Sequence, residues 1–333
     1  MRPHAPAARI VEIAVCIACA LVGSTHASAD ADNARVAEKQ REGTVLGMFC
    51  RVGQNEWRQV LSHDAAGIVL DTKPVTFEDI WTNPETKSEP NAAKETIAWD
   101  KPLPAVPDDD VTSWAYALTY HEHRREARLD KSFKFPKGGP AFPTSKPIAY
   151  RDNLDYEVEF GVLMQRGRTD RFGYMLVNDL TDRGVQVREY DEKNPVPSFS
   201  RSKTFPESLR VGPLLAIGDA AAWKALEATL DVNGEQRQHI HASDCVYDPQ
   251  RFHSEIFGDT ANPEWVLVAS GTGGGVVFRQ PSLVGKLWLF IRGGFSVNGA
   301  KERLLKRLDF LKTGDTVVIS SPTLGYAATT VRE

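Results

Sequence analysis

The pattern of apolar and polar residues from position 111 onward predicts a chain built mainly from β-strands. Residues 111–120 (VTSWAYALTY) are apolar and aromatic, and residues 156–165 (YEVEFGVLMQ) alternate, as in a strand with one solvent-facing side. Residues 172–179 (FGYMLVND) form a nearly continuous apolar run, which is typical of a strand buried on both faces. Alternation on both sides of Asn233-Gly234 predicts a two-residue hairpin within residues 225–240.

Helical patterns are fewer and shorter than strand patterns. Residues 121–130 (HEHRREARLD) predict one helix, and residues 300–311 (AKERLLKRLDFL) predict another. The second has apolar residues at helical spacing, namely Leu304, Leu305, Leu308 and Leu311. Further strands are expected at EWVLVASGT (264–272), KLWLFIRG (286–293) and DTVVISS (315–321). These elements together predict an α+β fold dominated by β-sheet.

Turn-forming residues divide the chain into regions. Residues 83–110 are rich in Pro, Asn, Lys and Asp, which is loop composition and predicts a boundary. We therefore expect an N-terminal region and linker at residues 30–110, with mixed short helix and strand signals. The main domain is expected at residues 111–333.

The first 29 residues have the pattern of a secretory signal peptide. Arg2 and Arg9 precede an apolar run at residues 13–23, and Ala27-Ser28-Ala29 offers a small-residue cleavage site. The run is shorter than the about 20 residues that a membrane span needs, although an uncleaved anchor is the alternative. Cleavage near Ala29 would export the mature chain to the periplasm or the medium, where disulfides are permitted.

Composition restricts the kinds of partner. The chain has 333 residues, of which 41% are hydrophobic and 25% charged, and its formal net charge is -4. No basic stripe or basic amphipathic helix points to nucleic acid, or to a membrane for the mature form, so a small molecule is the expected partner. Cys50 and Cys245 remain after cleavage, and their pairing is left open. Nothing in the sequence has the spacing of a zinc site.

Three segments carry residues capable of chemistry. Glu157 and Glu159 are two apart on an expected strand, so their carboxylates point the same way. Asp179 ends the apolar strand, where a loop begins that can reach a site. His123 and Glu126 are neighbours on one helical face, and a carboxylate beside an imidazole can orient a general base. Taken singly, these residues are better explained as a solvated face, a turn cap and a salt-bridged surface helix.

Six segments in this order resemble the fumarylacetoacetate hydrolase family. They are TYHEHRRE (119–126), FPKGGP (135–140), LDYEVEFGVL (154–163), FGYMLVNDLTDRGVQ (172–186), KTFPESLRVGP (203–213) and SGTGGG (270–275), and LKTGDTVVIS (311–320) is similar to the family's ending. The resemblance covers residues 100–331 and rests on the order of the segments, since none is specific alone. It implies a mixed β-sheet roll of that family's C-terminal domain type, with a small N-terminal region.

The resemblance implies that Glu157, Glu159 and Asp179 bind a divalent cation, Mg²⁺ first, with Mn²⁺ or Ca²⁺ as alternatives. Carboxylate oxygens are the ligands that hard cations take, and three of them leave positions for water and substrate. A 2-oxo or 1,3-dioxo acid would chelate there through two oxygens, and its carbonyl would be polarised. The ion would also offset the cost of crowding three acids.

The resemblance also implies catalytic roles for His123, Glu126 and Lys203. Glu126 would orient His123, which would activate a water molecule for attack on a carbonyl carbon. Lys203 would stabilise the negative charge that develops. Substrate contacts are implied for Lys137, Arg183, Gln186 and Thr272, the last binding a carboxylate through its hydroxyl and backbone N–H.

The chain departs from the family pattern near the pocket. Thr119 stands where the family has Asn, and Ala117 stands where it has Gly. The loop between Gln186 and Lys203 has a length of its own. Because these segments shape the pocket, the identity of the substrate is left open.

The leading hypothesis is a Mg²⁺-dependent hydrolase that cleaves a C–C bond in a small diketo acid, acylpyruvate-like or fumarylacetoacetate-like. A decarboxylase, isomerase or dehydratase of a 2-oxo acid would use the same enolate chemistry, and the His–Glu pair favours hydrolysis. A non-catalytic exported binding protein is the remote alternative, which the retained dyad and acids disfavour. The family also implies a homodimer, with KLWLFI or EWVLVA at the interface.

Overall fold

The computed structural model describes residues 45–85, 88–89, 91–107, 111–129, 131–258, 263–278 and 281–333. The predicted signal peptide at residues 1–29, with its cleavage site at Ala29, lies outside these residues, so export stays a prediction. Within the described ranges, no helix has both the length and the apolar character needed to cross a membrane.

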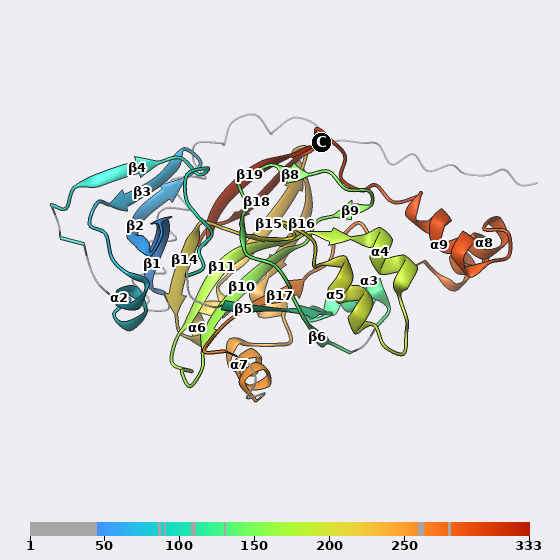
Figure 1. The fold of residues 1–333 in the computed structure, drawn as a ribbon, viewed down its shortest axis with the longest axis horizontal. Helices are drawn as coiled ribbons and strands as arrows, with labels where there is room; N and C mark the ends of the chain where they lie inside the picture. The colour runs from blue at the N-terminus through green and yellow to red at the C-terminus, as the bar shows by residue number, and fades with distance from the viewer. Residues whose placement is uncertain are drawn as a thin grey trace, which may run out of the picture.

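Twelve of the described strands form one large sheet (Figure 1). The strands are β1 (Val45–Gly53), β2 (Glu56–Asp64), β3 (Gly67–Asp71), β4 (Lys94–Ile97), β5 (Val111–Ala117), β6 (Phe133–Pro136), β7 (Phe142–Pro143), β10 (Val158–Gln165), β11 (Phe172–Asp179), β13 (Leu209–Val211), β14 (Leu214–Gly218) and β17 (Trp265–Thr272). Their order is β4-β3-β2-β1-β14-β11-β10-β17-β5-β6, and β13 joins β7 to β11. The two chemistry-bearing strands, β10 and β11, are therefore central and paired antiparallel.

Two smaller sheets complete the β-structure. The five-stranded sheet has the order β16-β15-β18-β19-β8 and contains β8 (Ile148–Ala149), β15 (Glu227–Val232), β16 (Glu235–His241), β18 (Thr316–Ser321) and β19 (Gly325–Arg332). The two-stranded sheet pairs β9 (Leu154–Asp155) with β12 (Thr181–Asp182). The predicted Asn233-Gly234 hairpin is confirmed, since both residues have positive φ (54° and 79°) between β15 and β16.

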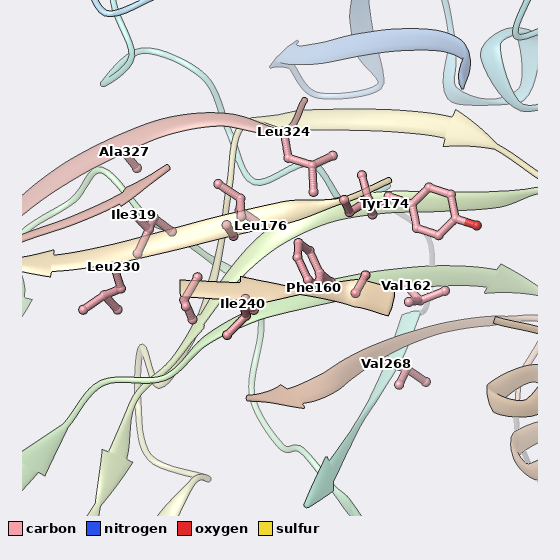
Figure 2. Packing of buried hydrophobic residues seen from close by; sticks show 14 of the residues in the cluster. Phe160, Val162, Tyr174, Leu176, Leu230, Ile240, Val268, Ile319, Leu324 and Ala327 are labelled. Carbon is pink, nitrogen blue, oxygen red and sulfur yellow. The ribbon is translucent and has the colours of Figure 1, made fainter. Parts of the chain in front are cut away.

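A hydrophobic core lies between the large and the five-stranded sheets. Phe160 and Val162 of β10 pack there with Leu176 of β11, and with Leu230 and Ile319 of the second sheet (Figure 2). All five side chains are almost fully buried. Each such burial stabilises the fold by about 1.5–3 kcal/mol, so this core fixes the faces that β10 and β11 present.

The opposite face of β10 is also buried, so the predicted solvent-facing side of this strand is wrong. Leu163 of β10 and Met175 of β11 belong to a second core, which includes Trp81 and Phe199. Glu159 shares the face of Leu163, because side chains alternate along a strand. The acids on this strand therefore point into the protein. The continuous apolar run of β11 is buried at every position, as predicted.

The described helices are short and lie around the sheets (Figure 1). They are α2 (Phe77–Thr82), α3 (His121–Ala127), α4 (Arg183–Glu189), α5 (Val196–Ser202), α6 (Ala220–Lys224), α7 (Pro249–Phe257), α8 (Leu283–Arg292) and α9 (Val297–Leu305), with one 3₁₀ turn at Ala242–Asp244. The predicted β-rich α+β class, a mixed-sheet fold with few helices, is confirmed in this part of the chain.

The predicted strand at residues 286–293 is wrong, because KLWLFIRG lies in helix α8. Ser282 caps this helix by accepting a hydrogen bond from the Gly285 N–H, and the Gly293 N–H closes its end on the Leu289 carbonyl at 2.8 Å. An apolar run of this length does not distinguish a helix from a strand by periodicity alone. The capping residues on both sides decide for the helix.

The predicted helix at residues 300–311 is displaced toward the N-terminus. Helix α9 starts after Ser296, whose hydroxyl accepts from the Gly299 N–H at 2.9 Å, and it ends at Leu305. Leu308 and Leu311 lie beyond it, where the Leu311 N–H pairs with the Leu154 carbonyl. Tertiary pairing with the start of β9 thus ends the helical pattern early.

The N-terminal strands continue the large sheet, since β1 pairs with β14. The strand β4 lies inside the segment that loop composition marks as a linker, so this segment is not wholly irregular. Cys50 and Cys245 are both free thiols. The boundary near residue 110 stays a prediction.

The two segments proposed for a dimer interface differ in exposure. EWVLVA lies mostly in β17, which is buried between β10 and β5, so it has no free face for a second copy. Helix α8 instead carries the exposed side chains of Trp288 and Ile291, and α8 and α9 lie at the end of the molecule opposite β1–β4 (Figure 1). The homodimer stays a prediction, which light scattering of the purified protein would check; a monomeric mass at micromolar concentration would contradict it.

Candidate active site

The central strands bring three acids together. Glu157 immediately precedes β10, Glu159 lies on it, and Asp179 ends β11. Antiparallel register places Val158 opposite Asn178, and the Asp179 N–H donates to the Glu157 carbonyl at 2.8 Å. The three side chains are buried, and one carboxylate oxygen from each lies within 4.8 Å of the others. The strand ends thus converge on one point.

Buried cations surround this group of acids. The Lys203 Nζ lies 2.6 Å from Glu157 Oε2 and 2.7 Å from Asp179 Oδ2. Lys137 donates to the other oxygen of Asp179 and, at 3.3 Å, to the Ser208 hydroxyl. These lysines are 3% exposed, so neither interaction is screened by bulk water.

Arg183 links the acids to a fourth carboxylate. Its guanidinium donates to Glu157 and, at 2.6 Å, to Asp155 Oδ2. Asp155 is fully buried and also accepts hydrogen bonds from the Tyr156 and Val277 N–H groups. Three buried cations therefore face four buried carboxylates, which leaves an excess of negative charge.

Among the described residues, Glu159 is the acid that carries this unbalanced negative charge. Burial raises the pKa of Glu159 well above its ordinary value, and the neighbouring charges of Asp179 and Glu157 raise it further. Burial would also raise the pKa of Glu157, but the charges of Lys203 and Arg183 outweigh it and hold that pKa below its ordinary value. Within the described residues no cation forms an ion pair with Glu159. Its carboxyl accepts one hydrogen bond at 2.9 Å, from the Gly271 N–H.

These observations fit a divalent cation. Three convergent carboxylate oxygens are the donor set of a hard metal ion such as Mg²⁺ or Mn²⁺. An ion there would supply the positive charge that Glu159 lacks, and would reverse the desolvation penalty on its charged form. The buried acids of this group are thus a candidate metal site.

The general-base candidate lies beside this site. His123 is 8% exposed on α3, and it lies near enough to the acids that a positive charge on its imidazole would lower the pKa of Glu157. Its Nδ1 lies 4.0 Å from Glu126 Oε2, beyond hydrogen-bond length, and has no hydrogen-bond partner among the described residues. The Glu126 carboxylate accepts the Gly275 N–H at 3.3 Å. The two predicted dyad residues are therefore adjacent but not hydrogen-bonded to each other.

Thr119 and Thr272 both serve the scaffold of the site. The Thr272 hydroxyl donates to the Val158 carbonyl at 2.7 Å and accepts from Gln238 Nε2 at 2.9 Å. Its predicted role in binding a substrate carboxylate remains untested, and the hydroxyl is already engaged in both directions. Thr119, where the family pattern has Asn, donates to the Ser270 carbonyl at 2.5 Å and so ties the start of α3 to β17.

Arg183 and Gln186, predicted to grip the substrate, lie together on α4. Arg183 donates to Gln186 Oε1 at 2.5 Å. The Gln186 amide nitrogen is buried and has no hydrogen-bond partner among the described residues. A buried donor without an acceptor carries a free-energy cost, so this amide is available for an oxygen of a bound molecule.

Sequence reasoning did not single out Asp155 and Gln238. Asp155 has the same strand parity as Glu157 and Glu159, so the alternation that marked the two glutamates extends to it. Gln238 sits in β16 opposite Leu230, on the buried face, where its carbonyl accepts the Val158 N–H at 2.9 Å. In the sequence, the signal for Gln238 is an amide side chain on the apolar face of an alternating strand.

Removal of Lys203 should destabilise the metal-free protein strongly. Lys203→Met takes the bridging cation from Glu157 and Asp179, and breaking a buried pair costs about 3–5 kcal/mol. We expect a loss of that order in the free energy of unfolding, measured in urea with a chelator present. Lys312→Met removes an exposed lysine that pairs with Asp309 at 2.7 Å, and it should have little effect. Equal effects of the two substitutions would contradict this account of the charges.

Gly271 should tolerate no side chain. Its φ is +84°, and an added Cβ would lie 2.3 Å from Thr119 Oγ1 and 2.7 Å from the Tyr116 carbonyl oxygen. Gly271→Ala should therefore lower the free energy of unfolding by more than about 2 kcal/mol. Gly167→Ala is the matched control, since Gly167 also has positive φ but nothing within 4 Å. Indistinguishable urea midpoints of the two variants would refute the close contact.

The mixed sheet and the buried acids where β10 begins and β11 ends define a β-rich protein with a candidate metal centre. Residues 112–332 match the family described as fumarylacetoacetate (FAA) hydrolase C-terminal. The match covers more than half of the chain, and the chain belongs to this family. The resemblance inferred from the six ordered segments is confirmed.

Related proteins have several activities. The mitochondrial oxaloacetate tautomerase FAHD1 of Mus musculus is 31% identical over 173 residues, which cover 47% of this chain and 77% of that protein. A maleylpyruvate hydrolase from Sphingobium sp. SYK-6 has a similar structure, with a TM-score of 0.52, 17% identity, and 86% and 99% of the two chains covered. A 2-hydroxyhepta-2,4-diene-1,7-dioate isomerase from Mycobacterium marinum also has a TM-score of 0.52 and 17% identity, with 86% and 98% covered. These two structures show a shared fold, and the family includes hydrolases, isomerases and a tautomerase.

Proposed function

We propose that this protein is a divalent-metal-dependent hydrolase that cleaves a C–C bond in a small diketo acid, such as an acylpyruvate. The observation that carries the proposal is the buried group of Glu157, Glu159 and Asp179 with His123 beside it. The acids would hold the ion, Mg²⁺ first and Mn²⁺ or Ca²⁺ as alternatives. When bound, the ion supplies Lewis-acid polarisation of a substrate carbonyl.

His123 is the proposed general base. It accepts a proton from water, and the resulting hydroxide oxygen adds to the distal carbonyl carbon of the diketo acid. The bond between this carbon and the neighbouring methylene then breaks, which yields a carboxylic acid and, after the methylene carbon takes up a proton, a 2-oxo acid. Glu126 accepts from Nδ1 once the 4.0 Å gap closes and so orients the ring and stabilises its protonated form.

Charged and amide groups of the chain position the substrate. Lys203 presents a buried ammonium between Glu157 and Asp179, where it stabilises negative charge on the departing 2-oxo acid. The Gln186 amide nitrogen, which lacks a partner among the described residues, donates to a substrate oxygen, and Arg183 holds Gln186 in place. The Lys137 ammonium donates hydrogen bonds to Asp179 and to the Lys203 carbonyl and so holds both in position.

Tautomerisation of a 2-oxo dicarboxylic acid is the second candidate. The observation in its favour is the 31% identity to the oxaloacetate tautomerase, which extends over 77% of that protein. Such a reaction needs a base that moves a proton between carbon and oxygen, and it needs no attacking water. The same His123 and the same acids would serve it, so the two candidates differ in the reaction and not in the site.

Product analysis separates the two functions. The purified protein is incubated with acylpyruvates and, separately, with enol-oxaloacetate, with Mg²⁺ or with a chelator. Hydrolysis predicts Mg²⁺-dependent loss of diketone absorbance with equal amounts of pyruvate and the second acid. Loss of enol absorbance from oxaloacetate, without any cleavage product from the acylpyruvates, would replace the hydrolase by the tautomerase. No turnover of either substrate class would reject both.

A further inference from the structure

A second group of metal-ligand side chains lies on the outer face of the β15–β16 hairpin. It consists of Glu227 on β15 and His239 and His241 on β16. Glu227 pairs directly with His241 across the strands, and His239 is two residues along the same face. Ala228, Leu230 and Ile240 point the other way into the core, so the three polar side chains face outward together.

The three side chains are close enough to share one ion. Glu227 Oε2 lies 3.8 Å from His239 Nε2 and 3.8 Å from His241 Nδ1. One ligand atom from each residue lies within 4.8 Å of the others, and the two imidazole rings are 4.5 Å apart between centroids. Ligands that are each about 2.0–2.1 Å from a tetrahedral zinc ion lie about 3.4 Å apart. The two Glu227–imidazole distances exceed this spacing by about 0.4 Å, and both imidazoles are partly exposed, with side chains 43% and 44% exposed, so that they can turn toward an ion.

The ligand atoms of this second group differ in kind from those of Glu157, Glu159 and Asp179. Two imidazoles are borderline ligands, and together with one carboxylate they form a donor set that binds Zn²⁺ and its neighbours in the transition series in preference to Mg²⁺. Sites with three protein ligands of this type leave a coordination position open. Sequence spacing did not reveal the group, because Glu227 comes from the facing strand.

A cavity of about 410 Å³ lies beside the group. Glu227 and His239 contribute to its wall, together with Trp99, Ser320 and Tyr326. The Trp99 and Tyr326 rings lie 6.1 Å apart and form an aromatic side of this wall. An ion held by the three ligands would therefore lie beside a partly open cavity of small-molecule size.

Strand β16 lies between the two candidate metal sites, because its inward side contacts residues beside the buried acids and its outward side carries the two imidazoles. Gln238, the residue before His239, points inward, and its side chain bonds to the Val158 N–H and to Thr272 beside the carboxylate group. His239 points outward, because successive side chains alternate. The outer group is therefore separate from the residues of the proposed catalytic centre.

We propose that Glu227, His239 and His241 form a second metal site, which binds Zn²⁺ or a similar transition-metal dication with one position open to the neighbouring cavity. This site does not depend on the proposed function, since it shares no ligand with the carboxylate group.

Zinc titration of the chelator-treated protein tests the proposal. Mg²⁺ is kept in excess to compete at the carboxylate group, and Zn²⁺ binding is measured by calorimetry and by zinc content after dialysis. We expect one Zn²⁺ per chain at the hairpin in the wild type. His239→Ala/His241→Ala should weaken this binding by more than about 100-fold, since even changes outside the ligand shell cost 10–100-fold.

Matched variants locate the ion. Glu159→Gln alters the other candidate site, so this variant should still bind Zn²⁺ at the hairpin. His121→Ala removes an exposed histidine elsewhere, and Glu235→Gln removes an exposed carboxylate on the same hairpin; neither should alter the affinity. X-ray absorption of the zinc-loaded protein should show two imidazole ligands in the wild type and one in His241→Ala.

Several outcomes would overturn the site. Equal Zn²⁺ binding in the wild type and the double histidine variant would assign the ion elsewhere. If Glu159→Gln were the only variant to lose Zn²⁺ binding, the ion would be placed at Glu157, Glu159 and Asp179. For the open position, azide should shift the visible spectrum of the Co²⁺-loaded protein; an unchanged spectrum would mean a closed coordination shell.

Discussion

Glu159→Gln should abolish catalytic turnover and also the thermal stabilisation by Mg²⁺, while the fold is kept. The substitution preserves volume and removes one charge from a site that must balance a divalent cation. Burial raises the pKa of Glu159 and so favours its neutral form in the metal-free protein, and Gln imitates that form. The amide oxygen of Gln can still accept the Gly271 N–H. The melting temperature with a chelator should therefore be close to that of the wild type.

The measurement is a pair of melting curves, with Mg²⁺ and with chelator, together with turnover of the best substrate. Glu78→Gln is the control, since Glu78 is an exposed glutamate on α2. This control should retain both activity and the Mg²⁺-dependent shift. Mg²⁺ stabilisation that survives in Glu159→Gln would contradict the metal assignment.

The wild type and Glu159→Gln should differ in the pH dependence of their free energy of unfolding when metal is absent. The pKa of Glu159 is raised in the folded state, mainly by burial, above the ordinary value of 4.5. As the pH rises past this value, the carboxyl ionises in the unfolded chain and stays protonated in the folded one, so folding loses stability. The wild type should thus become less stable relative to Glu159→Gln as pH rises. A constant difference would indicate that Glu159 is not desolvated.

His123→Ala should lower kcat by about 10²–10⁴-fold, which is the usual contribution of a general base. KM and metal binding should change little, because His123 belongs to α3 and not to the group of acids. Its Nδ1 is buried and has no partner in the part of the chain that the structure describes, so loss of the ring breaks no hydrogen bond of this atom there. Steady-state kinetics and the Mg²⁺-dependent melting shift measure these two properties separately.

Two variants of α3 calibrate this result. Glu126→Gln should reduce kcat less than His123→Ala, because Glu126 orients the base and does not itself take the proton. His121→Ala should behave almost as the wild type, since His121 is the exposed first residue of the helix. If His121→Ala were inactive and His123→Ala active, the alignment of TYHEHRRE with the family would be displaced by two residues, and the dyad would be wrong.

Local sequence was sufficient for several elements. The continuous apolar run 172–179 and the Asn233-Gly234 turn predicted β11 and the β15–β16 hairpin, because burial and positive φ leave few alternatives. The run KLWLFIRG was misread, since an apolar segment of this length fits a strand or a helix and Ser282 and Gly293 decide between them. The solvent-facing side of β10 was also misread, because a second core covers it.

The residues of the candidate site could be named from the order of the motifs, but their surroundings could not. Strand parity joined Glu157 to Glu159, whereas the pairing of β10 with β11 was needed to bring Asp179 within reach. The positions of Lys137, Lys203 and Arg183 among these acids depend on loops and on α4, which no local pattern specifies.

In the β15–β16 hairpin, the sequence determines the turn, whereas the tertiary structure determines the register of the two strands. The Asn233-Gly234 turn by itself sets Val232 against Glu235, and a regular ladder from there would place Glu227 opposite Ile240. A bulge between Leu230 and Asp231 shifts the register by one residue, so that Glu227 meets His241 and all three polar side chains share the outer face. The turn follows from local backbone preference, which the sequence determines. The bulge follows from packing Leu230 and Ile240 together into the core, which only the folded protein supplies.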